Sequence, residues 1–363
     1  MLLVRQFYYK FDKNKNTFLN MLCQQSKKIN IVYTVKNLKI INSKRLLDNL
    51  ALFSHKKVCA MVKADAYGHG MRQIAEILQD KVFCFGVAKV EEGAVLRSFC
   101  KTPIVVVGKT FDFDCARKNN LIVVIESEAE AKMAIKFGLS VFVKIDCGMK
   151  RLGVNSAKTL KKIVAKFDCC KKLLLGFSVH FSNTASKEST QKQYQKFLRF
   201  KKLLPKGKLI SFGGSGVVDY DFEFDIIRVG LGLYGYQSEM AKPVMKIVSF
   251  VEKVFVARKG DWLGYGNKFQ VQKTGKFALV PVGYADGLQR GLTGQKLLAN
   301  DKECEIVGNV CMDVCFVQVD NSVSVGDRVV VMQDATAFAN QLGTIEYEIL
   351  TNFSRFRGEV VVE

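Results

Sequence analysis

Short apolar runs alternate with longer amphipathic stretches from about residue 33 to residue 245. The stretches have the apolar spacing of helices, and the runs between them are rich in the β-branched residues that strands favour. Parallel strands joined by helices form an open sheet or a closed barrel, and this regular repetition favours a (β/α)8 TIM-like barrel over residues 33–245. Strands are predicted at VCAMV (58–62), CFGVA (84–88), PIVVVG (103–108), LIVVI (121–125), SVFVKID (140–146) and LLLGFSVHF (173–181).

The pattern changes after Met245. Segments such as VSFVEKVFVARKG, KFALVPVGYADG, CEIVGNVCMDVCFVQVD and DRVVVMQ are typical of strands with Gly, Asn and Asp turns between them. They predict a second, mostly β-strand domain over residues 246–363. Residues 1–32 are polar, rich in Lys and Asn, and fit neither domain, so we expect either a flexible N-terminal extension there or an incorrectly assigned start.

The composition favours a globular protein that is neither exported nor embedded in a membrane. Hydrophobic residues make up 48% of the 363 residues, and the longest apolar runs are far shorter than the roughly 20 residues of a membrane-spanning helix. The N-terminus lacks the apolar core of a signal peptide. The eleven cysteines show no CxxC spacing. We therefore expect reduced thiols, no metal site, no membrane partner and a cytoplasmic location.

A formal net charge of +21 permits binding to nucleic acid. The lysines are spread along the whole chain, however, and rise locally in residues 161–172 and 192–208, where they fall on the polar faces of expected helices. Aromatic and basic residues are not interleaved as in single-strand binding proteins. A solvated basic surface is favoured, and we expect no nucleic-acid partner.

The segment VCAMVKADAYGHG (58–70) carries the most specific chemistry. It places Lys63 at the end of an apolar strand, with Tyr67 and two glycines after it. A desolvated lysine has a lowered pKa and can attack an aldehyde as the neutral amine. Active-site residues of a barrel gather at the carboxyl ends of its strands, so Lys63, Arg151, His180 and the glycines after Ile210 become candidates together.

The string KADAYGHG resembles the coenzyme-lysine motif of the alanine racemases, which belong to the fold-type III pyridoxal-phosphate enzymes. Further segments similar to this family follow in the family's own order, and the likeness extends from about residue 33 to the C-terminus. They are FGVAKVEEGAVLR (85–97), KIDCGMKRLGV (144–154), HFSNT (180–184), RVGLGLYG (228–235), LGYG (263–266), GYADGLQR (283–290) and NVCMD (309–313).

The resemblance implies that Lys63 binds pyridoxal 5'-phosphate as an imine and moves the substrate α-proton on one face, while Tyr265 moves it on the other. Two opposed acid/base groups suffice, because a planar carbanion gives either enantiomer according to the face that receives the proton. The resemblance also implies a homodimer with shared active sites, in which Tyr265 comes from the second subunit.

The same resemblance implies the remaining contacts. Arg228 would lie at the pyridine nitrogen, to which a guanidinium can only donate, and His180 near the ring. Lys144 matches a lysine that is carbamylated in many members, which would position Arg151 near the coenzyme phenolate oxygen. Phosphate contacts would come from Tyr67, Ser215, Gly230, Leu231 and Tyr347. Substrate contacts would come from Arg151, Tyr284, Arg290, Met312 and Asp313.

Two positions depart from the family pattern. Gly214 stands before Ser215 where the family usually has Asn, and Val229 stands where it often has Pro. The first change removes a side-chain hydrogen bond near the phosphate, so a lower coenzyme affinity or a compensating group is expected.

The leading hypothesis is interconversion of L- and D-alanine, with D-alanine supplied for peptidoglycan. The closest rival is a racemase for serine or for a broad range of amino acids. A non-catalytic pyridoxal-phosphate-binding protein is less favoured, because such proteins lack the β domain that bears Tyr265.

Overall fold

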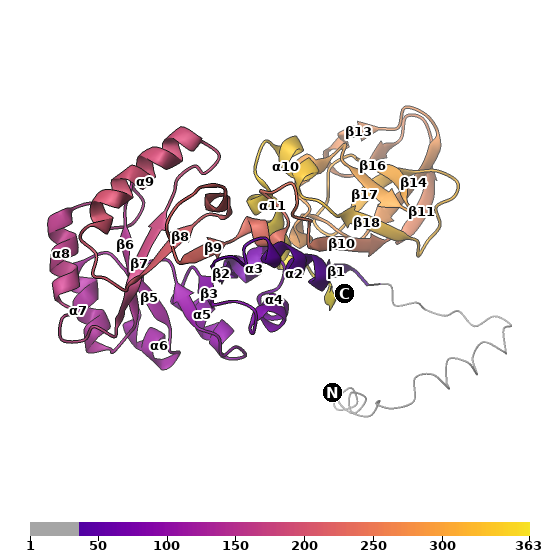
Figure 1. Ribbon diagram of the computed structural model, residues 1–363. Helices are drawn as coiled ribbons and strands as arrows, with labels where there is room; N and C mark the ends of the chain where they lie inside the picture. The colour runs from indigo at the N-terminus through magenta and orange to yellow at the C-terminus, as the bar shows by residue number, and fades with distance from the viewer. Residues whose placement is uncertain (1–35) are drawn as a thin grey trace, which may run out of the picture. The chain divides into compact units, whose positions relative to one another are not determined.

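Eight parallel strands close into a barrel in the order β2-β3-β4-β5-β6-β7-β8-β9 (Figure 1). The structure, a computed structural model, describes residues 36–363, so the extension expected over residues 1–32 lies outside the described residues. The closed barrel confirms the predicted fold class. Its strands are β2 (Lys57–Met61), β3 (Cys84–Val87), β4 (Ile104–Val106), β5 (Ile122–Ile125), β6 (Val141–Ile145), β7 (Leu174–His180), β8 (Leu209–Gly213) and β9 (Ile226–Val229).

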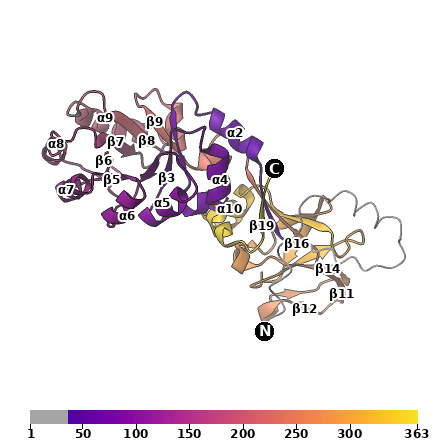
Figure 2. The ribbon, with the colours of Figure 1, turned by 90° about the horizontal axis from the view of Figure 1, so that it is seen from below.

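Amphipathic helices connect the barrel strands and lie outside them (Figure 2). Ser127, Ser156 and Ser186 each cap a helix by accepting a hydrogen bond from a backbone N–H of its first turn. The longest helix, α9, buries Tyr194 and Phe197 with other residues at helical spacing. The helices are α4 (Met71–Leu78), α5 (Val90–Arg97), α6 (Phe113–Lys118), α7 (Glu128–Lys136), α8 (Ala157–Ala165) and α9 (Lys187–Lys201).

The second domain contains a nine-stranded sheet in the order β11-β14-β17-β16-β15-β18-β10-β1-β19, and a two-stranded ribbon, β12 with β13. It also contains two helices, α10 (Thr336–Leu342) and α11 (Glu346–Asn352), inside a region predicted to be mostly strands. The strands are β1 (Leu38–Ile41), β10 (Met245–Phe250), β11 (Lys253–Ala257), β12 (Trp262–Leu263), β13 (Phe269–Gln270), β14 (Gly275–Val280), β15 (Lys296–Ala299), β16 (Lys302–Val307), β17 (Cys315–Val319), β18 (Arg328–Met332) and β19 (Glu359–Val362).

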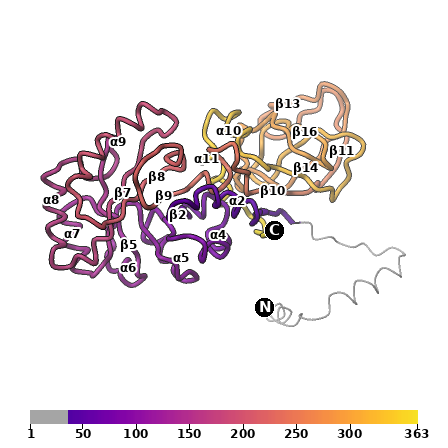
Figure 3. Tube along the Cα trace, in the orientation of Figure 1, coloured from indigo at the N-terminus to yellow at the C-terminus, as the bar shows by residue number. Residues whose placement is uncertain are grey.

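Strand β1 joins this second sheet. It pairs antiparallel with β10, with Leu38 opposite Val248, and parallel with β19, with Leu38 opposite Glu359. The boundary predicted at residue 33 places this segment with the barrel instead. The difference arises because a short apolar strand does not encode its own partner. After β1, helix α2 (Ser43–Ala51) leads the chain into β2, and β9 later leads back towards β10 (Figure 3).

The carboxyl ends of the barrel strands and the loops that follow them hold several of the predicted site residues. Lys63 follows β2, His180 ends β7, Ser215 follows β8 and Gly230 follows β9. Short 3-10 helices form several of these loops and their counterparts in the second domain. They are η1 (Ser215–Asp219), η2 (Leu231–Tyr234), η3 (Tyr265–Asn267), η4 (Tyr284–Asp286), η5 (Arg290–Leu292) and η6 (Phe353–Arg355). Among residues 36–363, no helix has the length and apolar character needed to span a membrane.

Candidate active site

Lys63 begins a turn of unusual backbone conformation, α3 (Lys63–Tyr67), directly after β2. The next four residues all have positive φ: 50° at Ala64, 53° at Asp65, 53° at Ala66 and 55° at Tyr67. A left-handed helical conformation costs roughly 1–2 kcal/mol for each L-residue. This turn is therefore strained, and neighbouring groups must hold it in place.

Barrel residues hold the beginning and the middle of the turn. Ala64 N donates a hydrogen bond to Glu92 Oε1 at 2.7 Å, and Met71 N donates to Asp65 Oδ1 at 2.7 Å. The second carboxylate oxygen of Glu92 accepts from the backbone of Ala88 at 2.7 Å. Glu92 thus links the lysine turn to the loop after β3.

The second domain holds the end of the turn. Lys39 Nζ, from β1, donates to Gly68 O at 2.7 Å. Gly68 has a φ of 80°, and a Cβ at this position would lie 2.0 Å from the carbonyl oxygen of Leu350 in α11. Only glycine fits this close approach. The lysine turn is consequently held between the barrel and the second domain.

His69 is fully buried beside the turn. Its Nδ1 lies 3.0 Å from Ala66 O and 3.1 Å from Tyr67 O, and its ring stacks on Tyr234 at 4.3 Å between centroids. Carbonyl oxygens only accept, so Nδ1 carries the proton. Burial lowers the pKa of His69 to about 3, despite the favourable backbone contacts. The imidazole is therefore neutral at ordinary pH.

The environment of Lys63 favours its neutral amine. Burial is the main cause that lowers the pKa of Lys63, and the nearby cations of Arg151 and Arg228 lower it further, while Glu92 acts in the opposite direction. The amine nitrogen lies 5.8 Å from the centre of the Tyr67 ring. A more readily deprotonated lysine is better able to attack a carbonyl carbon and to accept a proton.

Arg228 lies buried on the barrel interior. Its Nη1 donates to Ser211 O at 2.9 Å and to Ser211 Oγ at 2.8 Å, and its Nη2 donates to Val179 O at 2.7 Å. Burial lowers the pKa of Arg228 to about 10, so the guanidinium stays charged at neutral pH. A guanidinium has five N–H donors, and donors remain available for a ligand.

His180 lies next to Arg228. A Cβ on Gly213 would stand 2.2 Å from Arg228 Nη2 and 2.3 Å from His180 Nδ1, so both side chains occupy the space above this glycine. Burial lowers the pKa of His180 to about 3, and Arg228 and Arg151 add to the effect. A neutral His180 beside a charged Arg228 follows.

Lys144 is buried at the end of β6, close to these cations. Burial, followed by the charges of Arg228 and Arg151, lowers the pKa of Lys144 to about 8. A small pocket beside it is lined by Glu126, Lys109 and several apolar residues. A neutral amine next to open space can react with a small electrophile.

Tyr67 and Gly230 meet at the barrel mouth, where they follow the neighbouring strands β2 and β9. A Cβ on Gly230 would lie 2.5 Å from the Tyr67 hydroxyl oxygen. The Tyr67 ring packs against Tyr234 at 5.2 Å and Tyr347 at 5.7 Å. Burial raises the pKa of Tyr67 above its ordinary value, so its hydroxyl remains a hydrogen-bond donor.

The loops of η1 and η2 come together beside Tyr67. Gly232 N donates to Ser215 Oγ at 3.1 Å, and Gly214 before Ser215 has a φ of 107°. Leu231 is buried at the start of η2. The positive φ suits glycine, which gives a structural reason for the departure from Asn at position 214.

A separate group of predicted residues lies on the second domain. Tyr265 is 73% exposed, Met312 52% and Tyr284 37%. Their loops are joined by hydrogen bonds: Asn309 Nδ2 donates to Tyr265 O at 2.8 Å, and Tyr284 N donates to Cys311 O at 3.0 Å. We call Tyr265, Tyr284, Met312 and Asp313 the exposed face of the second domain.

The structure therefore gathers the predicted residues into two groups. At the barrel mouth the charges of Arg151 and Arg228 both help to lower the pKa values of Lys63, Lys144 and His180, so these residues form the first group. Arg290 begins η5 and is exposed, and within residues 36–363 no side-chain hydrogen bond or ion pair joins it to the exposed face of the second domain.

Sequence reasoning missed Glu92 and Lys39, which hold the lysine turn. Glu92 has a recognisable signal, because a Glu three residues after the N-cap of a helix commonly accepts a hydrogen bond from the N-cap backbone N–H. Here Lys89 is the N-cap of α5, and its N donates to Glu92 Oε2 at 3.2 Å. Lys39 has no such signal, since its contact depends on the placement of β1.

Comparison with known proteins gives a consistent picture. The family model for the alanine racemase N-terminal domain matches residues 41–238, and the model for the C-terminal domain matches residues 244–361. The alanine racemase of Thermodesulfovibrio yellowstonii is 35% identical over 334 residues, which cover 85% of this chain and 90% of that protein.

Solved structures agree. The alanine racemase from E. faecalis superposes with a TM-score of 0.85 at 25% identity, covering 92% of this chain and 100% of that chain. The alanine racemase from Bartonella henselae, solved with covalently bound pyridoxal phosphate, gives a TM-score of 0.81 at 25% identity, with 90% and 99% coverage. On this evidence the chain belongs to the alanine racemase family of pyridoxal-phosphate-dependent isomerases.

Proposed function

We propose that this chain interconverts L- and D-alanine by moving the α-proton between Lys63 on one face of the substrate and Tyr265 on the other. The observation that carries the proposal is a lysine amine at the barrel mouth, with its pKa lowered by burial and by Arg151, next to a protonated tyrosine hydroxyl and a buried guanidinium.

The residues at the barrel mouth fit pyridoxal 5'-phosphate, which carries an anionic phosphate and phenolate. Arg228 and Arg151 supply positive charge near Lys63. The missing side chain at Gly230 leaves backbone next to the Tyr67 hydroxyl, where an anion can approach closely. In this proposal the coenzyme ring is held by His180 and Arg228. The phosphate is held by Tyr67, Ser215, Gly230, Leu231 and Tyr347.

Bound at Lys63, pyridoxal phosphate supplies an electron sink that makes the α-proton of an amino acid removable. The chain's own contribution is to hold and move that proton. Lys63 Nζ would accept it on one face in its neutral form, which the lowered pKa favours. The Tyr265 hydroxyl would exchange it on the other face. Arg228 would direct N–H donors at the ring, because a guanidinium has no acceptor.

Substrate recognition is proposed for Arg151, Tyr284, Arg290, Met312 and Asp313. The amino acid's carboxylate would be matched by the positive charge of Arg151. The pKa of Lys144 is lowered to about 8, so near that pH a fraction of its side chains carries the neutral amine. In this proposal Lys144 is carbamylated and positions Arg151.

We also propose a homodimer in which Tyr265 of the partner subunit completes each site. The exposure of Tyr265, Tyr284 and Met312 supports a partner there, since large apolar side chains are usually covered. A mixing experiment tests this arrangement. Lys63→Ala and Tyr265→Phe chains are each impaired, but random exchange gives half heterodimers with one intact site of two, and so about a quarter of wild-type activity. No recovery after demonstrated exchange contradicts shared sites.

The product D-alanine would serve peptidoglycan synthesis. The reaction itself is tested by incubating purified, coenzyme-loaded protein with L-alanine, and separately with L-serine, and measuring the D-enantiomer formed. We expect rapid conversion of alanine, slower conversion of serine, and none with Lys63→Ala. Faster conversion of serine than of alanine would identify serine as the preferred substrate. No conversion of either amino acid would refute the proposal.

A further inference from the structure

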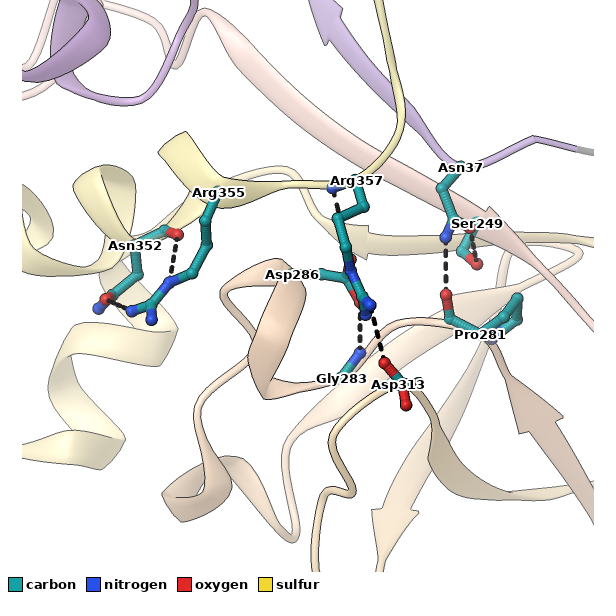
Figure 4. A network of polar contacts seen from close by, with 9 residues as sticks. All are labelled: Asn37, Ser249, Pro281, Gly283, Asp286, Asp313, Asn352, Arg355 and Arg357. Carbon is teal, nitrogen blue, oxygen red and sulfur yellow. Dashed lines mark hydrogen bonds and ion pairs between the residues drawn. The ribbon is translucent and has the colours of Figure 1, made fainter.

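The guanidinium of Arg357, in the segment after η6, makes two charged hydrogen bonds and one ion pair (Figure 4). Its Nε donates to Asp286 Oδ1 at 2.8 Å, its Nη2 donates to Asp286 Oδ2 at 2.9 Å, and its Nη1 lies 2.8 Å from Asp313 Oδ1. The paired bonds to Asp286 fix the plane of the guanidinium, as in other bidentate arginine–carboxylate pairs. One cation thus joins two carboxylates from different loops.

The two carboxylates belong to the loops that carry Tyr284 and Met312. Asp286 ends η4, which begins at Tyr284, and is only 2% exposed. Its Oδ2 also accepts from Gly283 N at 3.0 Å. Asp313 directly follows Met312 in sequence.

The backbones of these loops are already in contact. Ala285 N donates to Met312 O at 3.0 Å, and a Cβ on Gly283 would stand 2.3 Å from the same oxygen. At so close an approach, a small displacement of Asp286 or Asp313 shifts both exposed side chains.

Charge provides a second reason for a cation at this point. Without Arg357, Asp286 would be a buried carboxylate without a counter-charge, and Asp313 would add a negative charge beside Met312. Both effects oppose the binding of an anionic amino-acid carboxylate nearby. Hydrogen bonds to Asp286 and then Asp313 raise the pKa of Arg357, so the cation persists at every pH of interest.

We infer that Arg357 is a positioning residue for substrate recognition: it sets the loops of Tyr284 and Met312 and neutralises the charge beside them. The inference rests on the proposed function, which places these two residues at the substrate. Arg357 would act through Asp286 and Asp313, which its guanidinium contacts, and not on the reacting atoms.

Arg355, two residues earlier, provides a matched control. Its Nε donates to Asn352 O at 3.2 Å and its Nη2 to Asn352 Oδ1 at 2.5 Å, both within its own segment (Figure 4). The test compares Arg357→Ala and Arg357→Lys with Arg355→Ala and Arg355→Lys in the full-length, coenzyme-loaded protein. For each, KM and kcat with both alanine enantiomers, the coenzyme affinity and the thermal midpoint are measured.

We expect Arg357→Ala to raise KM for both enantiomers by about 10- to 100-fold, with kcat changed by less than about threefold and coenzyme affinity unchanged. Arg357→Lys should fold and raise KM by about 3- to 10-fold, because an ammonium keeps the charge but cannot form the planar fork to both carboxylates. Both Arg355 variants should keep the wild-type KM.

The inference would be overturned if Arg357→Lys kept the wild-type KM while Arg357→Ala either kept the wild-type KM or failed to fold. So would a rise in KM that the Arg355 variants share, or one that follows loss of coenzyme. The proposed function fails separately, if wild type and Arg355→Ala do not racemise alanine.

Discussion

Replacing Gly230 with Ala tests how the chain would hold the coenzyme phosphate. The new Cβ would lie 2.5 Å from the Tyr67 hydroxyl oxygen, about 1 Å closer than ordinary van der Waals contact. Tyr67 cannot yield easily, since its ring packs between Tyr234 and Tyr347. If the hydroxyl is displaced from the phosphate, a hydrogen bond to a charged group is lost, which costs roughly 1.5–3 kcal/mol. This corresponds to coenzyme binding weaker by about 10- to 150-fold.

The assay is titration of coenzyme-free protein with pyridoxal phosphate, followed by the visible absorbance of the lysine-bound coenzyme. Gly275→Ala is the control, because a Cβ there meets its nearest neighbour, Lys273 O, at 3.6 Å. Tyr67→Phe removes the same hydroxyl directly. If Gly230→Ala acts through that hydroxyl, the double variant is little worse than either single variant. Fully additive losses, or wild-type affinity in Gly230→Ala, would refute the reasoning.

Two further predictions concern pH. Burial lowers the pKa of His69 to about 3 in the folded protein, below the ordinary histidine value of 6.5. Between these two pH values only the unfolded chain protonates this histidine, so the folded state loses stability as the pH falls. By pH 5 the free energy of unfolding should decrease by about 2 kcal/mol. In denaturant titrations at pH 7.5 and 5, His69→Asn should lack this contribution to the loss of stability, whereas the exposed control His55→Asn should retain it. Equal losses of stability in both variants would contradict the assignment to His69. The pKa of Lys144 is lowered to about 8, so its reactive neutral form increases as pH rises through this value. With 13C-labelled bicarbonate, a carbamate resonance should grow over this range in wild type and in Lys109→Ala and be absent in Lys144→Ala; its persistence in Lys144→Ala would exclude this lysine.

The barrel was predictable because its information is local. Each buried parallel strand is a continuous apolar run, and each covering helix shows its own periodicity, so the predicted strand at residues 140–146 coincides with β6. Candidate residues such as Lys63 and His180 could be grouped for the same reason, since strand ends in a barrel share one rim.

Long-range pairing was not predictable in this way. Nothing in the sequence of β1 specifies β10 and β19 as its neighbours, and the contact from Lys39 to Gly68 depends on that pairing. The left-handed turn after Lys63 is equally hidden, because Ala, Asp and Tyr lack glycine's freedom at positive φ. Surrounding contacts impose that conformation. Arg357 lies 71 residues from Asp286, so its role emerges only from the folded chain.

Proton exchange at the substrate α-carbon shows most directly whether Lys63 and Tyr265 act on opposite faces. Tyr265→Phe is incubated in deuterated water with each alanine enantiomer, and loss of the α-proton is followed by NMR. Tyr194→Phe, which removes a hydroxyl on α9 that accepts a hydrogen bond from Glu223 N at 3.3 Å, is the control.

Tyr265→Phe should slow exchange by about 10²- to 10⁴-fold for one enantiomer. Exchange of the other enantiomer should stay near the wild-type rate, because Lys63 still removes that proton. Equal slowing for both enantiomers, or for neither, would contradict the two-base assignment.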